Sequence, residues 1–168
     1  YIIFASIFNF CLNLDPKVVE VYQKVGLILS RYKSGKIPKA FKVIPTLKNW
    51  EEVLALTSPE KWTANAMLEA TRIFASNLPP KVVERYFLEF ICSIFLFPSL
   101  IYRFYHYYLL DAVRRNFDET KTVNVHYFQA MKKAIYKPAA FFKGIIFPIV
   151  HDPLTTLKEA SVYCSVIS

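Results

Sequence analysis

The chain contains very little glycine: among its 168 residues there are only Gly26, Gly35 and Gly144. Nucleotide-binding α/β folds place glycines where the backbone approaches a phosphate, so this scarcity argues against such a fold. Ser34-Gly35-Lys36 matches part of a phosphate-binding loop, but Ser30 and Ile37 stand where the full pattern needs a glycine and a hydroxyl residue. We therefore interpret Gly35 as the end of a helix.

Metal-binding and catalytic patterns are also missing. Cysteines are few, far apart and odd in number, which argues against a disulfide framework or a zinc site and favours buried free thiols in a reducing compartment. The histidines show no metal-ligand spacing, and each is interpreted as a packing or surface residue. The residues in question are Cys11, Cys92, Cys164, His106, His126 and His151. We predict no catalytic residue, no metal, no cofactor, no small-molecule substrate and no enzyme activity.

Uncharged apolar runs of the length that a membrane-spanning helix needs are absent as well. Tyr1–Leu14 is apolar but lacks the basic start and the cleavage site of a signal peptide. Within Tyr86–Leu110 the longest uncharged run, Phe90–Tyr102, has 13 residues and contains Pro98, whereas a membrane-spanning helix needs about 20. We predict a buried helical hairpin there, and a membrane-associated helical protein stays open as the alternative function.

Acidic residues are missing from two long stretches, Val21–Trp50 and Thr120–His151, which together hold 12 of the 21 Lys and Arg residues. A basic surface attracts nucleic acid and anionic membranes alike, so charge alone does not choose between them. The most informative segment is Arg31–Glu52, which places basic residues around apolar anchors. It is too basic for a core and too apolar for a free tail. We interpret it as an ordered connector that presents positive charge to a polyanion.

We predict RNA contact at two surfaces, because lysine and arginine neutralise phosphate without any catalytic site. The first, called here the basic connector, consists of Arg31, Lys33, Lys36, Lys39 and Lys42. Pro38 and Pro45 limit the backbone freedom of this segment. The second, called the basic helix face, consists of Lys132, Lys133, Lys137 and the nearby Lys143. For each surface, a merely solvated face stays open as the alternative to RNA contact.

Aromatic residues, 17% of the chain, allow two interpretations where they lie beside basic residues. Such rings can stack on unpaired bases, but they more often fill the core between helices. We favour core packing for the four aromatic residues concerned, which are Phe41, Tyr136, Phe141 and Phe142.

Capping and proline patterns predict an all-α fold of about seven or eight helices, a helical array for which solenoid-like stacked hairpins are considered. The apolar stripe of the first helix is Val18, Tyr22, Val25, Leu29 and Tyr32. The first predicted helix begins at Asp15-Pro16 and ends at Ser34-Gly35. The next ones run from Asn49 to Leu56, from Ser58-Pro59 to Asn77, and from Lys81 onward. The remaining ones are Leu109–Phe117, Val125–Lys137 with Asn124 as its cap, Pro138 to Pro148, and a last helix from Asp152-Pro153 onward. Lys42–Leu47 is the best candidate for a strand, weakened by its proline.

Four segments carry a resemblance to the bystin family of ribosome-assembly factors: Leu14–Tyr22, Tyr32–Leu54, Trp62–Leu78 and Asn124–Ile149. The resemblance implies an α-helical, non-catalytic nucleolar factor for assembly of the small ribosomal subunit. It implies binding to precursor ribosomal RNA and small nucleolar RNA, and to pre-40S assembly factors and ribosomal proteins. It also implies residence in the nucleolus and nucleus, with shuttling to the cytoplasm on pre-40S particles. An RNA-modifying enzyme would need a cofactor site, and none is found.

Two parts of the chain depart from that family. Residues 1–13 form an unmatched apolar segment, whereas residues 14–168 resemble part of a bystin-like helical domain without its C-terminal helices. Ile91–Tyr108 looks inserted, because removing it joins Phe90 to Leu109 and restores family-like spacing. We therefore expect that deleting these residues preserves or raises stability.

Overall fold

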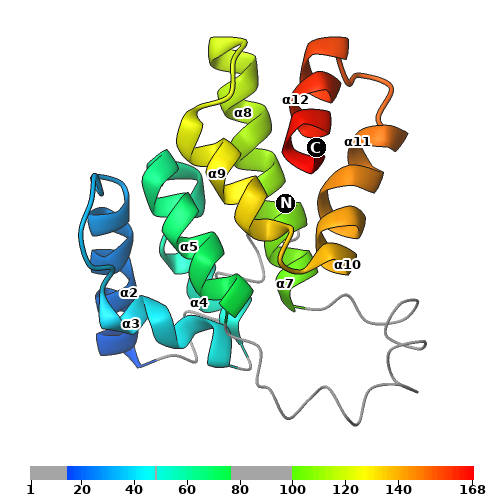
Figure 1. Ribbon diagram of the computed structural model, residues 1–168. Helices are drawn as coiled ribbons and strands as arrows, with labels where there is room; N and C mark the ends of the chain where they lie inside the picture. Colours follow the sequence, from blue (N-terminus) through cyan, green and yellow to red (C-terminus); the bar gives the residue numbers. More distant parts are fainter. Residues whose placement is uncertain (1–14, 48, 77–99) are drawn as a thin grey trace, which may run out of the picture. The chain divides into compact units, whose positions relative to one another are not determined.

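The structure is a computed structural model that describes residues 15–47, 49–76 and 100–168 (Figure 1). Every regular element in these ranges is helical, which confirms the predicted all-α class. The solenoid-like stacking stays a prediction. The unmatched segment 1–13, the helix expected from Lys81 and most of the expected hairpin Tyr86–Leu110 lie outside the described residues.

The chain forms two compact units, the first ending at Ala66 and the second beginning at Met67. Unit 1 contains α2 (Pro16–Leu29), α3 (Lys39–Val43), the 3-10 turn Ile44–Thr46, α4 (Trp50–Leu56) and the 3-10 turn Pro59–Lys61. The boundary falls within α5 (Ala64–Ser76). Unit 2 contains α7 (Leu100–Phe104), the π-helical turn η4 (Tyr105–Leu109), α8 (Leu110–Thr120), α9 (Val125–Ala134), α10 (Pro138–Phe141), the π-helical turn η5 (Phe142–Ile146), α11 (Phe147–His151) and α12 (Leu157–Ile167).

The first helix begins as predicted and ends earlier. Asp15 caps α2 by accepting the N–H of Lys17 at 3.0 Å, and Pro16 occupies the first helical position, where its missing N–H costs nothing. Of the predicted stripe, Tyr22, Val25, Leu29 and Tyr32 are buried and Val18 is half-buried. The expected end at Ser34-Gly35 is wrong, because α2 stops at Leu29.

The segment that follows α2 is helical rather than extended, so the strand candidate Lys42–Leu47 is wrong. Pro38 precedes α3 as its N-cap residue, and Pro45 lies in the first turn of the helix Ile44–Thr46. Proline is compatible with both positions, because the first turn of a helix leaves N–H groups unpaired anyway. The two prolines thus divide the segment into short helical turns.

The helix predicted from Ser58 to Asn77 is two elements. Pro59–Lys61 forms a separate 3-10 turn, after Ser58 adopts a left-handed φ of 49°. The main helix, α5, begins only at Ala64, and the hydroxyl oxygen of Thr63 accepts the N–H of Ala66 at 3.2 Å. Thr63 is therefore the N-cap that the sequence interpretation overlooked. One face of this helix is buried and consists of Ala66, Met67, Ala70 and Phe74.

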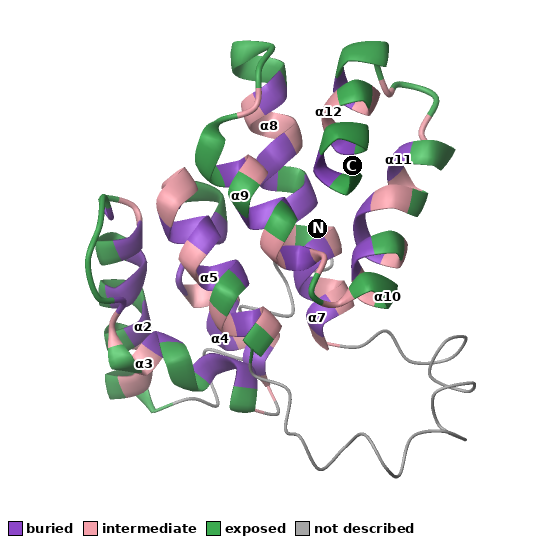
Figure 2. Cartoon of the chain, viewed as in Figure 1, coloured by how far each residue is buried: buried purple, intermediate pink, exposed green. Residues whose placement is uncertain are grey.

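In unit 2 the predicted helix starts are partly right. Asn124 caps α9 by accepting the N–H of His126 at 2.9 Å, as predicted, although α9 ends at Ala134 rather than Lys137. Each helix has buried residues along one side and exposed residues along another (Figure 2). Two predicted boundaries are wrong: Pro148 lies inside the first turn of α11, and α12 begins after Thr156 rather than at Asp152.

The described part of the suspected insertion belongs to the core of unit 2. Ile101, Phe104 and Tyr105 are buried, and the ring of Phe104 stacks on that of Phe74 with centroids 4.2 Å apart. Residues 100–108 therefore stabilise the unit, which runs against the expectation that their removal is harmless. Whether Ile91–Tyr108 is an insertion relative to the family stays a prediction.

Two further findings concern the thiols and the membrane. Cys164 is exposed, so the prediction of a buried thiol is wrong there, and Cys11 and Cys92 lie outside the described residues. In the described parts of the chain, no helix combines the length and the apolar character needed to cross a bilayer.

Candidate nucleic-acid interface

All five cations of the basic connector lie on the surface of unit 1. Arg31 and Lys33 follow the end of α2, Lys36 follows the turn at Gly35, and Lys39 and Lys42 belong to α3. Within the described residues, none of the five forms an ion pair with a carboxylate. Their positive charge is therefore available to an anionic partner.

Buried apolar residues alternate with these cations and hold the connector against unit 1. Ile37, Phe41 and Ile44 are 7%, 0% and 0% exposed. The ring of Phe41 meets that of Trp62 edge to face, with centroids 5.3 Å apart. Such apolar anchors fix the backbone, so the lysines between them project from an ordered segment.

Hydrogen bonds fix the entry to the connector. The hydroxyl of Thr63 donates to the carbonyl oxygen of Tyr32 at 2.6 Å. The side-chain amide of Asn65 donates to the carbonyl oxygen of Lys33. The Tyr32 hydroxyl donates to the carbonyl oxygen of Gly35 at 2.5 Å. Gly35 has a φ of 111°, which L-residues with a side chain rarely adopt, so glycine suits this turn. Arg31, Lys33 and Lys36 are thus carried on a fixed backbone.

An open hollow of about 590 Å³ lies beside the start of the connector. Leu27 and Ile28, 64% and 51% exposed, supply apolar surface next to the cationic Arg31 and Lys33. The hollow is lined by Leu27, Ile28, Arg31, Tyr32, Lys33 and Ser34. It adds apolar contact surface to the charged connector.

The basic helix face lies in unit 2 and is less exposed than the connector. Lys132 is exposed, whereas Lys133, Lys137 and Lys143 are half-buried. The ammonium of Lys132 lies 5.0 Å from the ring centroid of Phe128, and that of Lys133 lies 5.5 Å from the ring centroid of Tyr136. This surface therefore combines cations with aromatic rings, which is a cation–π arrangement.

The structure divides the four aromatic residues that lie beside basic residues. Phe41 and Phe141 are fully buried, which confirms core packing for both. Tyr136 is 75% exposed and Phe142 is 40% exposed, so core packing is wrong for these two. Only the tertiary structure separates the pairs, since all four have similar neighbours in the sequence.

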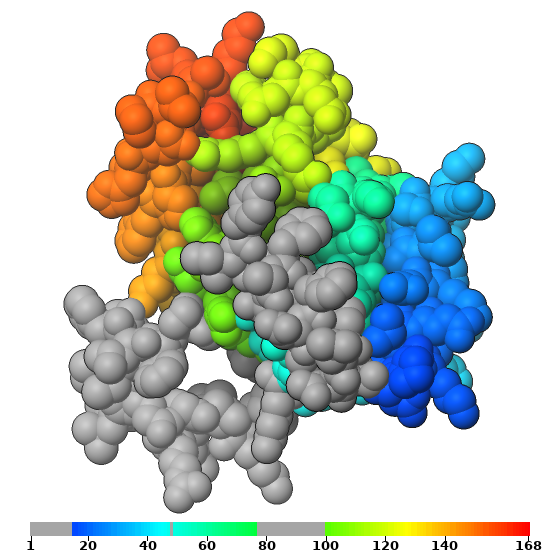
Figure 3. All heavy atoms as spheres, turned by 180° about the vertical axis from the view of Figure 1, so that it is seen from behind, coloured from blue at the N-terminus to red at the C-terminus, as the bar shows by residue number. Residues whose placement is uncertain are grey.

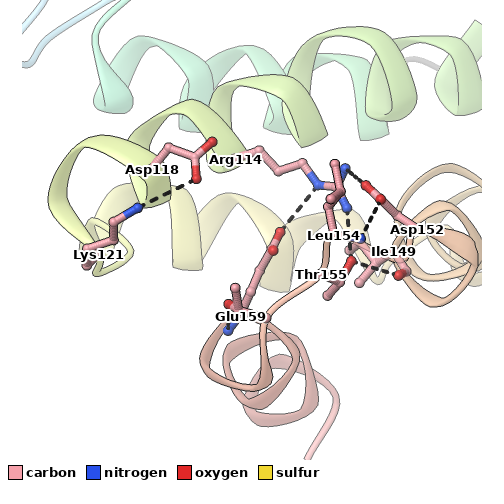
Figure 4. Close-up of polar contacts among 9 residues, drawn as sticks. Arg114, Asp118, Lys121, Ile149, Asp152, Leu154, Thr155 and Glu159 are labelled. Carbon is pink, nitrogen blue, oxygen red and sulfur yellow. Dashed lines mark hydrogen bonds and ion pairs between the residues drawn. The ribbon is translucent and has the colours of Figure 1, made fainter.

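A polar cluster that sequence reasoning missed joins α8 to the chain around α12 (Figure 4). The guanidinium of Arg114 pairs with Asp152 at 2.5 Å and with Glu159 at 3.3 Å. In Figure 3 the atoms of α8 meet those of the α11–α12 region on the face shown. Asp111 on the same helix pairs with Arg115, at 3.0 Å, whereas Arg114 pairs with the carboxylates near α12. The T-x-x-E pattern Thr156–Glu159, typical of a helix start, could have located this part of the cluster.

The titration of this cluster reflects its contacts. The backbone N–H of Leu154 and the Arg114 guanidinium hold the pKa of Asp152 below its ordinary value, because both favour the carboxylate. Burial raises the pKa of Tyr163 and of Tyr105, since the phenolate would lose its hydration. Glu159 is buried beside Arg114, which favours an internal structural role over contact with a ligand.

No metal-ligating cluster of His, Cys, Asp or Glu occurs among the residues that the structure describes. His126 and His151 are exposed, while the half-buried His106 lies 3.3 Å from the carbonyl oxygen of Gly144. The most distinctive features of the described surface are therefore its two groups of cations.

Comparisons with known proteins agree on one family. The family model described as Bystin matches residues 9–168. The chain is 50% identical to Bystin of Monosiga brevicollis over 150 residues, which is 89% of this chain and 32% of that protein. It is 46% identical to Bystin of Homo sapiens over 156 residues, which is 93% of this chain and 32% of that protein. The chain thus spans about a third of the length of these curated relatives.

Proposed function

The chain belongs to the bystin family, and from this premise we propose that it is part of a non-catalytic factor for assembly of the small ribosomal subunit. In this role it binds precursor ribosomal RNA and small nucleolar RNA, together with assembly factors and ribosomal proteins of pre-40S particles. Its place is the nucleolus and nucleus, with transfer to the cytoplasm on those particles. The family is not a known family of enzymes.

The observation that carries the proposal is the basic connector. Its five cations are exposed and, within the described residues, unpaired with carboxylates, while buried anchors and hydrogen bonds hold their backbone. Phosphate binding by lysine and arginine releases counterions from the nucleic acid, which gives affinity without base recognition. A fixed backbone lowers the entropy lost when these side chains meet RNA. The connector is therefore suited to a folded or single-stranded polyanion.

Charge reversal in the connector tests the proposal. The double variant Lys36→Glu, Lys39→Glu should weaken binding to precursor ribosomal RNA and reduce the slope of log affinity against log salt by about one for each lost contact. The control Lys17→Glu, Lys158→Glu makes the same change in net charge at two exposed lysines outside both surfaces. Fluorescence anisotropy at several salt concentrations measures affinity and slope, and circular dichroism checks the fold. Equal affinities and slopes for both double variants would contradict a role for the connector.

A further inference from the structure

The surface at the end of α9 contains aromatic rings that are not fully buried in the core. Tyr136 is 75% exposed, although a phenol ring usually hides its apolar faces. Phe128, one helical turn before Lys132, is half-buried. A single exposed aromatic residue is ordinary and by itself indicates nothing. The arrangement of these rings with cations is what distinguishes this surface.

Phe128 and Lys132 lie one helical turn apart on α9, and Tyr136 follows two residues after the helix ends. Phe128 and Lys132 are four residues apart, and residues at that spacing lie one above another on a helix. After Ala134 the chain forms a turn, in which the N–H of Tyr136 donates to the carbonyl oxygen of Lys133 at 3.2 Å.

Each cation lies over a ring of this surface. The Lys132 ammonium is 5.0 Å from the ring centroid of Phe128, and the Lys133 ammonium is 5.5 Å from that of Tyr136. Tyr136 stays 75% exposed in the presence of Lys133, so the ring still offers surface to a planar ligand. A planar group with an adjoining negative charge would contact both the ring and the ammonium.

We propose that Phe128, Lys132, Lys133 and Tyr136 form a platform for unpaired RNA nucleotides, with Tyr136 as the ring on which a base stacks. Unpaired bases stack on aromatic side chains while their phosphates meet lysine, and this mode tolerates different base sequences. Bases in a duplex already stack on one another and do not offer their faces. The inference rests on the proposed function and deepens it by naming single-stranded RNA as the ligand of this surface.

The basic connector differs from this platform in a way that can be tested. Its aromatic residues, Tyr32 and Phe41, are 8% and 0% exposed. The connector therefore offers cations without an open ring, and its binding should depend on phosphate alone. The platform should discriminate single strands from duplexes, whereas the connector should not.

Substitution of the exposed ring separates the two modes. Tyr136→Ala should weaken binding of an unstructured RNA oligonucleotide by about 5- to 150-fold, the range typical of one lost stacking contact. The salt slope should not change, because no cation is removed. Tyr136→Phe keeps the ring and should bind within about twofold of the wild-type chain. A duplex RNA of equal length should bind both variants like the wild type, as measured by fluorescence anisotropy.

The possible outcomes distinguish the platform from the proposed function. If Tyr136→Ala binds the oligonucleotide like the wild type while Lys36→Glu, Lys39→Glu binds it weakly, the platform is wrong and the proposed function stands. If the wild-type chain binds neither RNA, the proposed function fails and the platform fails with it. If Tyr136→Phe is as weak as Tyr136→Ala, the phenol hydroxyl rather than stacking makes the contact, which overturns the platform. If Tyr136→Ala weakens duplex and single strand equally, single-strand selectivity is wrong.

Discussion

The imidazole Nδ1 of His106 lies 3.3 Å from the carbonyl oxygen of Gly144, and these two residues join the π-helical turns η4 and η5. Pro148, four residues after Gly144, has no N–H for the usual helical bond to that carbonyl. Because a carbonyl oxygen only accepts, Nδ1 must donate the hydrogen. A Cβ added to Gly144 would lie 3.1 Å from the carbonyl oxygen of Tyr102, so the turns pack closely.

This contact predicts that substitutions of His106 and Pro148 have non-additive effects on the free energy of unfolding. His106→Ala should lower the free energy of unfolding by about 1–3 kcal/mol, because a partly buried carbonyl loses a donor. Pro148→Ala restores a backbone N–H that can bond to the Gly144 carbonyl. In that background His106→Ala should therefore lower the free energy of unfolding by less. Urea unfolding of the two single variants and the double variant measures the coupling. An identical cost of His106→Ala in both backgrounds would show that the ring contributes only packing.

Phe104 is predicted to be essential to the core of unit 2, although it lies in the suspected insertion. Phe104→Ala removes a fully buried ring stacked on Phe74 and should cost about 3–5 kcal/mol. Tyr107→Ala, at a neighbouring position that is 57% exposed, is the control and should stay within about 0.5 kcal/mol. Thermal unfolding followed by circular dichroism compares them. Deletion of Ile91–Tyr108 should likewise melt earlier, and a deletion variant as stable as the full chain would refute this assignment.

Arg114 is predicted to contribute more to the stability of the fold than cations in exposed ion pairs do. Arg114→Ala leaves the buried carboxylate of Glu159 without its guanidinium partner and should destabilise the fold by about 2–4 kcal/mol, since unpaired buried charge is costly. Lys24→Ala removes an exposed partner of Glu20 on α2 and should cost less than about 0.5 kcal/mol. Chemical unfolding measures both. The cluster has no structural role if the two variants lose similar stability.

Asp152 should make stability depend on pH. Its pKa in the folded chain is lowered, first by the Leu154 N–H and then by Arg114, so the carboxylate stabilises the fold at neutral pH. That contribution is lost as the pH falls from the ordinary aspartate value, about 4, through the lower folded value. Asp152→Asn should therefore be less stable than the wild type at pH 7, and the difference should shrink below about pH 4.

The control for this pH experiment is Asp118→Asn, an exposed carboxylate 3.9 Å from Lys121, which should change stability little at either pH. Urea midpoints at several pH values give the comparison. A difference between Asp152→Asn and the wild type that stays constant from pH 7 to pH 3 would exclude the proposed linkage.

Local patterns in the sequence predicted several helix starts correctly and several ends wrongly. Asp15-Pro16 and Asn124 act through hydrogen bonds within two residues, so their effect is visible in the sequence. Asp152-Pro153 has the same pattern, yet the carboxylate pairs with Arg114, 38 positions away, and with the N–H of Leu154. Asp152 thus accepts an N–H two residues on, as the caps do, and also makes a long-range ion pair, but α12 begins only after Thr156.

The candidate surfaces were predictable to different degrees. The cations of the basic connector could be chosen from the sequence, because lysine and arginine are seldom buried. The exposure of Tyr136 could not, since aromatic residues occur in cores and on surfaces, and Phe141 beside the same lysines is fully buried.

The sequence by itself determined the helical class, the family and the location of the cations, because capping, composition and ordered matches are properties of neighbouring residues. The tertiary structure alone decided which aromatic rings meet solvent, which carboxylates pair with Arg114, and that Phe104 belongs to the core. Each of these depends on contacts between segments far apart in the chain. Burial and pairing are set by which distant surfaces remove a side chain from water, and no local pattern specifies that.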